Sequence, residues 1–284
     1  ADIGAAMLGM GSREELQIIN QMGKCSLAER PCSGRRLMAL GSVMHMAHEG
    51  DVIFGTGIRS VADSAKNARR VTLTAVRGPL TRRELLKMGA APPSVYGDPA
   101  LLAPFIVWPT LRPNASASSP VCVLPHALDT SLHAQTLHAQ HQGMELRLLD
   151  AGTFPPRRLV GEMMQCRRLV TSSLHGLIFA DAYRVPVTWV RRDTLQPPFK
   201  YFDYLTSVDR SPHEFAHDLT SALQRPPAQL LSPRLLLNRS LGLIDAFPFA
   251  AMCSGANSSS LQHAHVPRAP ALRAPNRMHR AAHL

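Results

Sequence analysis

A chain of 284 residues has room for one large α/β domain or two modest ones, each with a buried core. Hydrophobic residues make up 45% of it and charged residues 18%, which excludes a wholly disordered protein. The formal net charge of +11 favours anionic partners such as phosphorylated metabolites, nucleotide-linked sugars and acidic glycans. Aromatic residues are only 5% and form no stacking motif, so we expect no nucleic-acid partner.

Two buried strands are predicted early in the chain, at 51–55 and 71–76, because apolar and β-branched side chains dominate both runs. A helix is predicted over 79–88, since proline is tolerated in a first turn and Gly89 stands where a C-terminal cap would lie. A turn follows at 97–99.

Residues 109–120 contain three prolines and no apolar periodicity, which is typical of a linker. Beyond it the pattern predicts strands at 121–124, 145–149, 168–171 and 187–190, and helices at 130–142, 156–165 and 174–183. Strands separated by helices imply parallel sheets covered on both faces. We therefore expect two Rossmann-like domains, at 1–108 and 121–247, that face one cleft.

The two ends of the chain differ from this pattern. Residues 1–35 predict a helix at 13–22 but no strand. Residues 248–284 are rich in Ala, Pro, Ser, His and Arg, and we expect this tail to be disordered.

No apolar run reaches the roughly 18 residues that a membrane-spanning helix needs, and the N-terminus lacks a signal-peptide pattern. We therefore expect a soluble, cytoplasmic chain without a transmembrane segment, for which peripheral membrane contact stays open. The alternative is that the targeting segment is missing from this chain. In a eukaryote, such a segment would allow a secretory location.

Five cysteines without a CxxC pair disfavour a zinc ribbon and a dense disulfide framework. Cys122 and Cys166 lie in apolar surroundings, where we expect buried free thiols. Cys25 and Cys32 could pair in an oxidising compartment, and the sequence leaves that open.

Histidines are frequent, so some fall at metal-ligand spacings by chance. His45 and His48 are three apart, whereas His133, His138 and His141 share a polar helix without a carboxylate at ligand spacing. We expect no metal site.

Ligands of parallel α/β sheets bind beyond the carboxyl ends of the strands, and helix N-termini there offer free N–H groups to phosphate or carboxylate. The residues that we expect to hold an anionic donor at these ends are Gly55, Thr56, Gly57, Asp98, Ser172, Ser173 and Gly176. The glycines do not form a GxGxxG fingerprint, and the serines do not form a GxSxG elbow. Dinucleotide binding and α/β-hydrolase chemistry are therefore disfavoured.

Arg77 and His175 are the candidate catalytic residues. Arg77 stands at a strand end, where its guanidinium could hold a carboxylate or phosphate; an ion pair with a local carboxylate is the alternative. His175 lies in the first turn of an apolar helix and is a candidate general acid or base, with a packed structural histidine as the alternative. Asp98, between glycine and proline, also fits a simple turn former.

Taken in order, these segments resemble the polysaccharide pyruvyl transferase family, especially its bacterial exopolysaccharide branch. The matching stretches in the first half are Leu40-Gly-Ser-Val43, Asp51-Val-Ile-Phe-Gly-Thr-Gly-Ile58, Ala75-Val-Arg-Gly-Pro-Leu-Thr-Arg82 and Tyr96-Gly-Asp-Pro-Ala-Leu-Leu102. Those in the second half are Leu124-Pro-His126, Ser172-Ser-Leu-His-Gly-Leu-Ile-Phe-Ala-Asp-Ala182, Arg184-Val-Pro186 and Lys200-Tyr-Phe-Asp-Tyr204 with Ser207.

The resemblance implies a fold like the GT-B glycosyltransferases and transfer of pyruvate from phosphoenolpyruvate to a sugar or glycan acceptor, commonly as a ketal that bridges two hydroxyls. It implies no cofactor beyond phosphoenolpyruvate as the donor substrate. His175 would be the general acid or base and Arg77 would hold the donor, while Gly176 and neighbouring N–H groups would take its other anionic group.

Two departures from the family pattern bear on activity. Many members carry an arginine two residues before the histidine, where this chain has Ser173, so that one donor contact is either missing or supplied by another arginine such as Arg191 or Arg192. Residues 1–40 hold no match to the usual opening strand and Gly-Asp turn, which predicts a truncated or divergent start. A glycosyltransferase that uses a nucleotide sugar and a degenerate, non-catalytic family member are therefore the alternatives.

Overall fold

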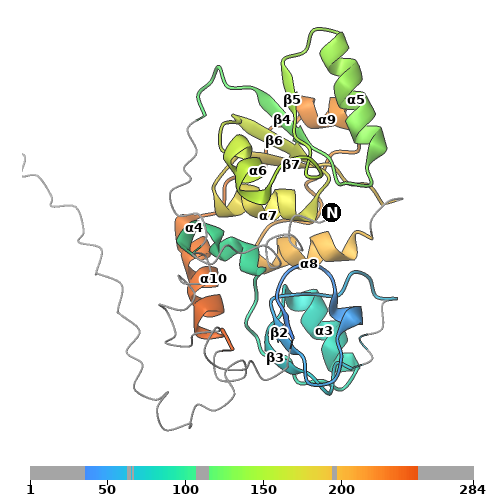
Figure 1. Cartoon of the computed structure of the whole chain (residues 1–284), viewed down its shortest axis with the longest axis vertical. Helices are drawn as coiled ribbons and strands as arrows, with labels where there is room; N and C mark the ends of the chain where they lie inside the picture. Colours follow the sequence, from blue (N-terminus) through green and yellow to red (C-terminus); the bar gives the residue numbers. More distant parts are fainter. Residues whose placement is uncertain (1–35, 63–64, 66, 107–114, 194–196, 249–284) are drawn as a thin grey trace, which may run out of the picture. The chain divides into compact units, whose positions relative to one another are not determined.

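The computed structural model describes residues 36–62, 65, 67–106, 115–193 and 197–248, which all belong to one compact unit of the chain (Figure 1). The helix predicted at 13–22, Cys25, Cys32 and residues 249–284 of the tail lie outside them. The division into domains at 109–120 stays a prediction.

The first sheet is parallel and has the strand order β1-β2-β3. Its strands are β1 (Leu37–Met38), β2 (Val52–Phe54) and β3 (Thr72–Ala75). The sheet extends past β3 through a parallel bridge between Val76 and Tyr96. The turn at 97–99 therefore starts beside the carboxyl end of β3.

The second sheet is also parallel, with the order β5-β4-β6-β7. Its strands are β4 (Val121–Leu124), β5 (Leu146–Leu148), β6 (Arg168–Thr171) and β7 (Val187–Trp189). Each consecutive pair in the chain is joined through a helix, as parallel neighbours require. These helices are α5 (Thr130–His141), α6 (Pro156–Met163) and α7 (Leu174–Ala182).

The remaining described elements are short helices and three helices that follow the second sheet. They are η1 (Met44–Met46), α3 (Pro79–Lys87), η2 (Pro99–Leu102), α4 (Ala103–Ile106), α8 (Phe199–Ser207), α9 (Leu219–Gln224) and α10 (Pro233–Asp245). The α/β class with two parallel sheets is confirmed, and every strand and helix predicted within the described residues is present. Strand β1 and helices α4, α8, α9 and α10 were not predicted. None of the described helices has the length and apolar character needed to cross a bilayer.

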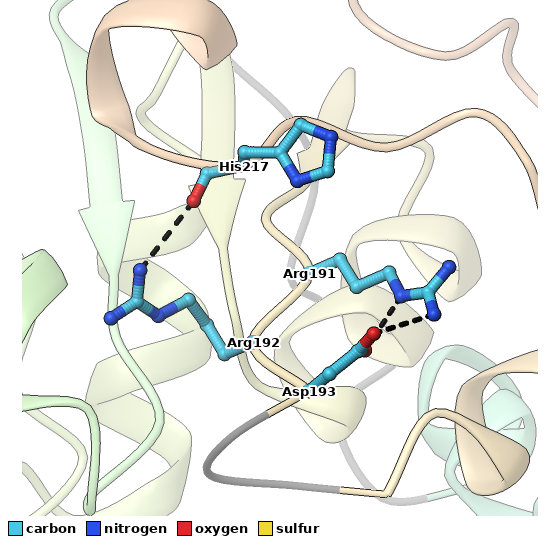
Figure 2. Close-up of a pocket in the computed structure, with 4 residues that line it drawn as sticks. All are labelled: Arg191, Arg192, Asp193 and His217. Atoms are coloured by element: carbon cyan, nitrogen blue, oxygen red, sulfur yellow. Dashed lines mark hydrogen bonds and ion pairs between the residues drawn. The ribbon is translucent and has the colours of Figure 1, made fainter.

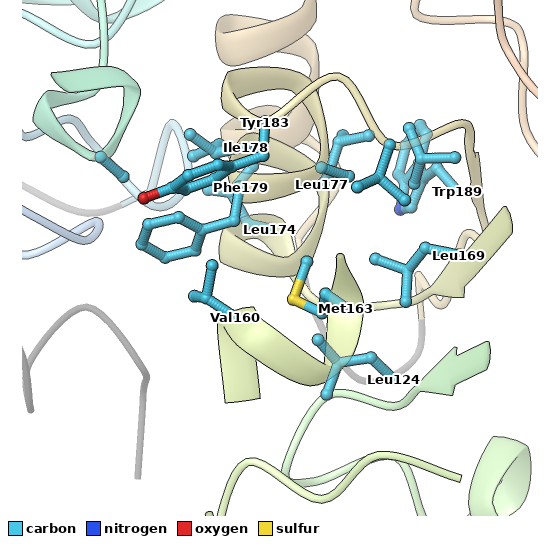
Figure 3. Close-up of a cluster of buried hydrophobic side chains, with 14 of the residues drawn as sticks. Leu124, Val160, Met163, Leu169, Leu174, Leu177, Ile178, Phe179, Tyr183 and Trp189 are labelled. Carbon is cyan, nitrogen blue, oxygen red and sulfur yellow. The ribbon is translucent and has the colours of Figure 1, made fainter. Parts of the chain in front are cut away.

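Helix α7 is the centre of the core around the second sheet (Figure 3). Every residue from Leu174 to Asp181 is buried, because the helix packs on β6, β7 and η2 and is apolar on all sides. Leu177, Ile178 and Phe179 expose at most 1% of their surface. This packing holds the first turn of α7, and with it His175, in a fixed place.

A disulfide between Cys122 and Cys166 joins β4 to the loop that precedes β6. The expectation of two free thiols is wrong, because the parallel pairing of β4 with β6 brings two cysteines 44 residues apart into one core cluster. Disulfides are typical of proteins that fold in an oxidising compartment, which weighs against the expected cytoplasmic location.

Replacing Cys122 and Cys166 together by alanine should lower the free energy of unfolding by about 2–4 kcal/mol, because the crosslink closes a long loop in the unfolded chain. Urea unfolding of the variant and of the unreduced parent measures the difference. Alkylation of the unfolded, unreduced parent provides the control: labelling of both thiols would contradict the crosslink.

Asp181 lies at the end of α7 in a buried polar cluster. Its carboxylate accepts a 2.8 Å hydrogen bond from the Tyr204 hydroxyl and lies 2.7 Å from the Arg210 guanidinium. Burial nevertheless raises the pKa of Asp181 to about 6, since the loss of hydration outweighs the two favourable partners. The ionised form is therefore less favourable in the folded protein than in the unfolded chain.

This raised pKa predicts that Asp181 stabilises the fold below about pH 4 and loses that contribution as the pH rises through about 6. The loss amounts to about 3 kcal/mol at most, from 1.36 kcal/mol per pKa unit. The unfolding free energy of Asp181→Asn, relative to the parent, should therefore rise across this pH range. The variant Asp209→Asn, at an exposed carboxylate, should show no such trend; a flat difference for both variants would contradict the assignment.

Candidate active site

The loop after β2 contains three of the residues expected to bind a donor. Gly55 has a φ of +82°, and a Cβ at this position would lie 2.3 Å from Pro99. The buried hydroxyl of Thr56 donates a 2.7 Å hydrogen bond to the carbonyl of Gly41. A Cβ on Gly57 would lie 2.6 Å from the guanidinium carbon of Arg77. Close packing thus accounts for both glycines, and their contact with a donor stays a prediction.

Arg77 is completely buried, and its guanidinium bonds to three groups of the protein. Its Nε donates a 3.0 Å hydrogen bond to the carboxylate of Asp203, and Nη2 donates one of 2.6 Å to the carbonyl of Ile58. Its Nη1 donates to the hydroxyl of Ser42. The guanidinium therefore holds together loops of the first sheet and helix α8.

Asp203 gathers further donors around the same pair. Its carboxylate accepts hydrogen bonds from the backbone N–H of Thr81, at 2.8 Å, and from the Thr81 hydroxyl, at 2.6 Å. Gly78 packs against it so closely that a Cβ would lie 2.1 Å from the carbonyl oxygen of Asp203. A buried charge pair of this kind is tolerated because every charge has hydrogen-bonding partners.

These contacts fit the alternative interpretation of Arg77, in which it pairs with a carboxylate of its own chain. Asp203 lies 126 residues away and was not among the expected site residues, although it falls within the matched stretch 200–204. A direct contact between Arg77 and a donor stays a prediction, and it would have to compete with the partners described above.

His175 and Asp98 are brought together from the two halves of the described chain. His175 Nε2 lies 3.8 Å from Asp98 Oδ2, and both side chains are almost fully buried. Asp98 also caps helix η2, because its Oδ1 accepts a 3.0 Å hydrogen bond from the N–H of Ala100. The turn-former interpretation is therefore correct for one oxygen of Asp98, while the other faces the imidazole.

The first turn of α7 is fixed by its serines. The Ser173 hydroxyl caps the helix by accepting from the N–H of Gly176 at 3.3 Å. The Ser172 hydroxyl accepts from the N–H of His126 at 3.0 Å, and its carbonyl accepts from the Tyr201 hydroxyl at 2.6 Å. The N–H of Gly176 is thus engaged by the cap. Anion binding by Ser172, Ser173 and Gly176 stays a prediction.

Helix α8 ties these groups to one another through three consecutive residues. Tyr201 reaches the end of β6 and stacks on Trp189, with ring centroids 4.7 Å apart. Phe202 lies beneath the guanidinium of Arg191, and Asp203 binds Arg77. Neither helix α8 nor the contacts of its side chains with different strand ends were predicted from the sequence.

A pocket of about 420 Å³ lies just past β7 (Figure 2). It is lined by Arg191, Arg192, Asp193 and His217. Arg191 and Arg192 are the two arginines proposed above as replacements for a charge at Ser173. In the part of the chain that the structure describes, no three His, Cys, Asp or Glu residues are grouped as metal ligands would be.

Residues 37–194 match the family described as polysaccharide pyruvyl transferase. An uncharacterised protein of Acanthamoeba polyphaga mimivirus is 30% identical over 171 residues, which cover 59% of this chain and 58% of that relative. The chain thus spans less than two thirds of the relative's length, and no solved structure matches it. With the match across more than half of its residues, including Arg77, Asp98 and His175, the chain belongs to the polysaccharide pyruvyl transferase family.

Proposed function

We propose that this protein transfers pyruvate from phosphoenolpyruvate to a sugar of a polysaccharide or glycan precursor and forms a pyruvate ketal. The observation that carries the proposal is the buried approach of His175 to Asp98 within the family-matched segment. A histidine beside a carboxylate is a typical general acid–base pair, because the carboxylate orients the ring and stabilises its charged form.

In this proposal His175 delivers a proton to the methylene carbon of the donor, which leaves an oxocarbenium-like centre at the neighbouring carbon. A sugar hydroxyl adds to that centre and returns a proton to His175. Phosphate leaves as the second hydroxyl closes the ketal, and it carries away the proton of that hydroxyl. Asp98 would orient the imidazole through both steps. The reaction consumes one donor and releases one phosphate for each ketal.

Arg77 has a positioning role in this proposal. Its bonds to Asp203 and Ile58 fix the ends of β2 and β3 relative to α8, whose Tyr201 in turn supports the loop before His175. The structure has two parallel sheets, and the candidate site residues lie beyond the ends of their strands. This arrangement supports the expectation of two Rossmann-like halves of the GT-B type.

Phosphate release from phosphoenolpyruvate tests the reaction, with galactose-, glucose- and mannosamine-type acceptors supplied in turn. We expect release that depends on one class of acceptor. The same acceptors with nucleotide sugars form the second arm, and product formed only there would identify a glycosyltransferase. No product in either arm, with no rise in melting temperature on adding phosphoenolpyruvate, would identify a non-catalytic member.

A further inference from the structure

The pocket past β7 opens at the same edge of the second sheet as the first turn of α7. Thr171 of β6 pairs with Trp189 of β7, so the two strands end side by side. Arg191 follows Trp189 by two residues, as Ser173 follows Thr171. Ligand groups in the pocket would therefore lie at the strand ends that also carry His175.

On one wall of the pocket, the positive charge of Arg191 is already paired with the carboxylate of Asp193. Arg191 makes two hydrogen bonds to Asp193, of 2.6 and 2.5 Å (Figure 2). Its guanidinium lies 4.8 Å from the ring centroid of Phe215. The backbone N–H of Arg191 donates to the carbonyl of Ala216 at 2.8 Å, which brings His217 to the pocket. Asp193 is half exposed, so its carboxylate can still accept from a ligand.

The other wall carries a cation that its neighbours hold only loosely. Arg192 Nε lies 3.5 Å from the buried carboxylate of Asp129, and Nη1 lies 3.5 Å from the carbonyl of His217 (Figure 2). A guanidinium has five N–H donors in a planar fork that matches two oxygens of a phosphate. Because these two contacts of Arg192 are long, most of its N–H donors can still bond to a ligand.

We propose that this pocket binds a phosphate or diphosphate group attached to the acceptor sugar. Arg192 holds the phosphate oxygens, His217 adds a donor, and Asp193 accepts hydrogen bonds from sugar hydroxyls. A volume of about 420 Å³ is large enough for a sugar phosphate. The assignment to the acceptor rests on the proposed function, whereas the phosphate site itself does not.

Isothermal titration without turnover tests the site. The probes are galactose phosphate, uridine-diphosphate galactose, inorganic phosphate, free galactose and phosphoenolpyruvate. Arg192→Gln should weaken galactose phosphate about 10- to 100-fold, the effect of losing a charge-assisted hydrogen bond. Arg167→Gln is the matched control, since Arg167 is exposed at the amino end of the same sheet. It should leave the affinity unchanged.

Each probe separates one alternative. Tighter binding of the uridine-diphosphate sugar than of the sugar phosphate would identify a diphosphate-linked acceptor, and the reverse order a monophosphate; either supports the site. Equal affinity for galactose and galactose phosphate, or equal losses in Arg192→Gln and Arg167→Gln, would overturn it. Loss of phosphoenolpyruvate binding in Arg192→Gln would overturn the assignment to the acceptor. Binding that depends on Arg192 without pyruvyl transfer would leave the site intact and contradict only the proposed function.

Discussion

Replacing His175 by asparagine should lower the rate of pyruvyl transfer about 100- to 10,000-fold, the usual effect of removing a general acid or base. Asparagine keeps a polar group of similar size facing Asp98 but has no proton that titrates near neutral pH. Because α7 is held by apolar packing on all sides, the melting temperature should change little. Steady-state kinetics beside thermal unfolding separates the chemical effect from a loss of structure.

Two further variants complete this test. His138→Asn changes an exposed histidine on α5 and should keep full activity. Asp98→Asn keeps an oxygen for the Ala100 cap and removes only the charge beside His175. It should lower the rate, since His175 loses the carboxylate that orients its ring. Full activity in His175→Asn would show that another group transfers the proton.

Replacing Asp203 by alanine should lower the free energy of unfolding by about 3–5 kcal/mol, because it leaves the guanidinium of Arg77 buried without a counter-charge. Thr81 loses two hydrogen bonds in the same step. For a protein of this size the melting temperature should fall by about 6–20 °C. Thermal and urea unfolding both measure the loss.

Asp203→Asn separates charge from shape in this cluster, since it keeps the volume beside Gly78. It should lose most of the same stability, because the missing charge is the larger cost. The control is Glu49→Ala, which removes an exposed ion pair with Arg70 and should cost at most about 1 kcal/mol. Similar stability losses in Asp203→Ala and Glu49→Ala would contradict the account of the buried pair.

Local sequence signals were sufficient for most of the secondary structure. The run at 71–76, which is rich in β-branched residues, and the apolar helix that begins at Leu174 are recognisable because neighbouring residues carry the pattern. Strand β1 has only two residues, so its pattern is too short to detect. Helix α10 exposes Leu237 and Leu241, which blurs the polar face that marks an amphipathic helix.

The site was predicted only as far as strand ends and helix N-termini could locate it. His175 follows β6, and Asp98 follows the bridge of Tyr96 with Val76 that extends the first sheet. The rule that ligands bind beyond strand ends selected both residues as candidates. The partner of Arg77 could not be found in this way, because Asp203 lies on a helix 126 residues further along. The same holds for Cys122 and Cys166, whose pairing depends on strand order rather than on spacing.

Transfer of labelled carbon from donor to acceptor distinguishes pyruvyl transfer from hydrolysis of the donor. The protein and His175→Asn are incubated with phosphoenolpyruvate that carries carbon-13 in the pyruvyl group, together with the acceptor selected by phosphate release. We expect an acceptor whose mass rises by one labelled pyruvate ketal, with a quaternary carbon signal in its NMR spectrum, and no such product from His175→Asn. Label found only in free pyruvate, or an unlabelled acceptor beside released phosphate, would contradict pyruvyl transfer.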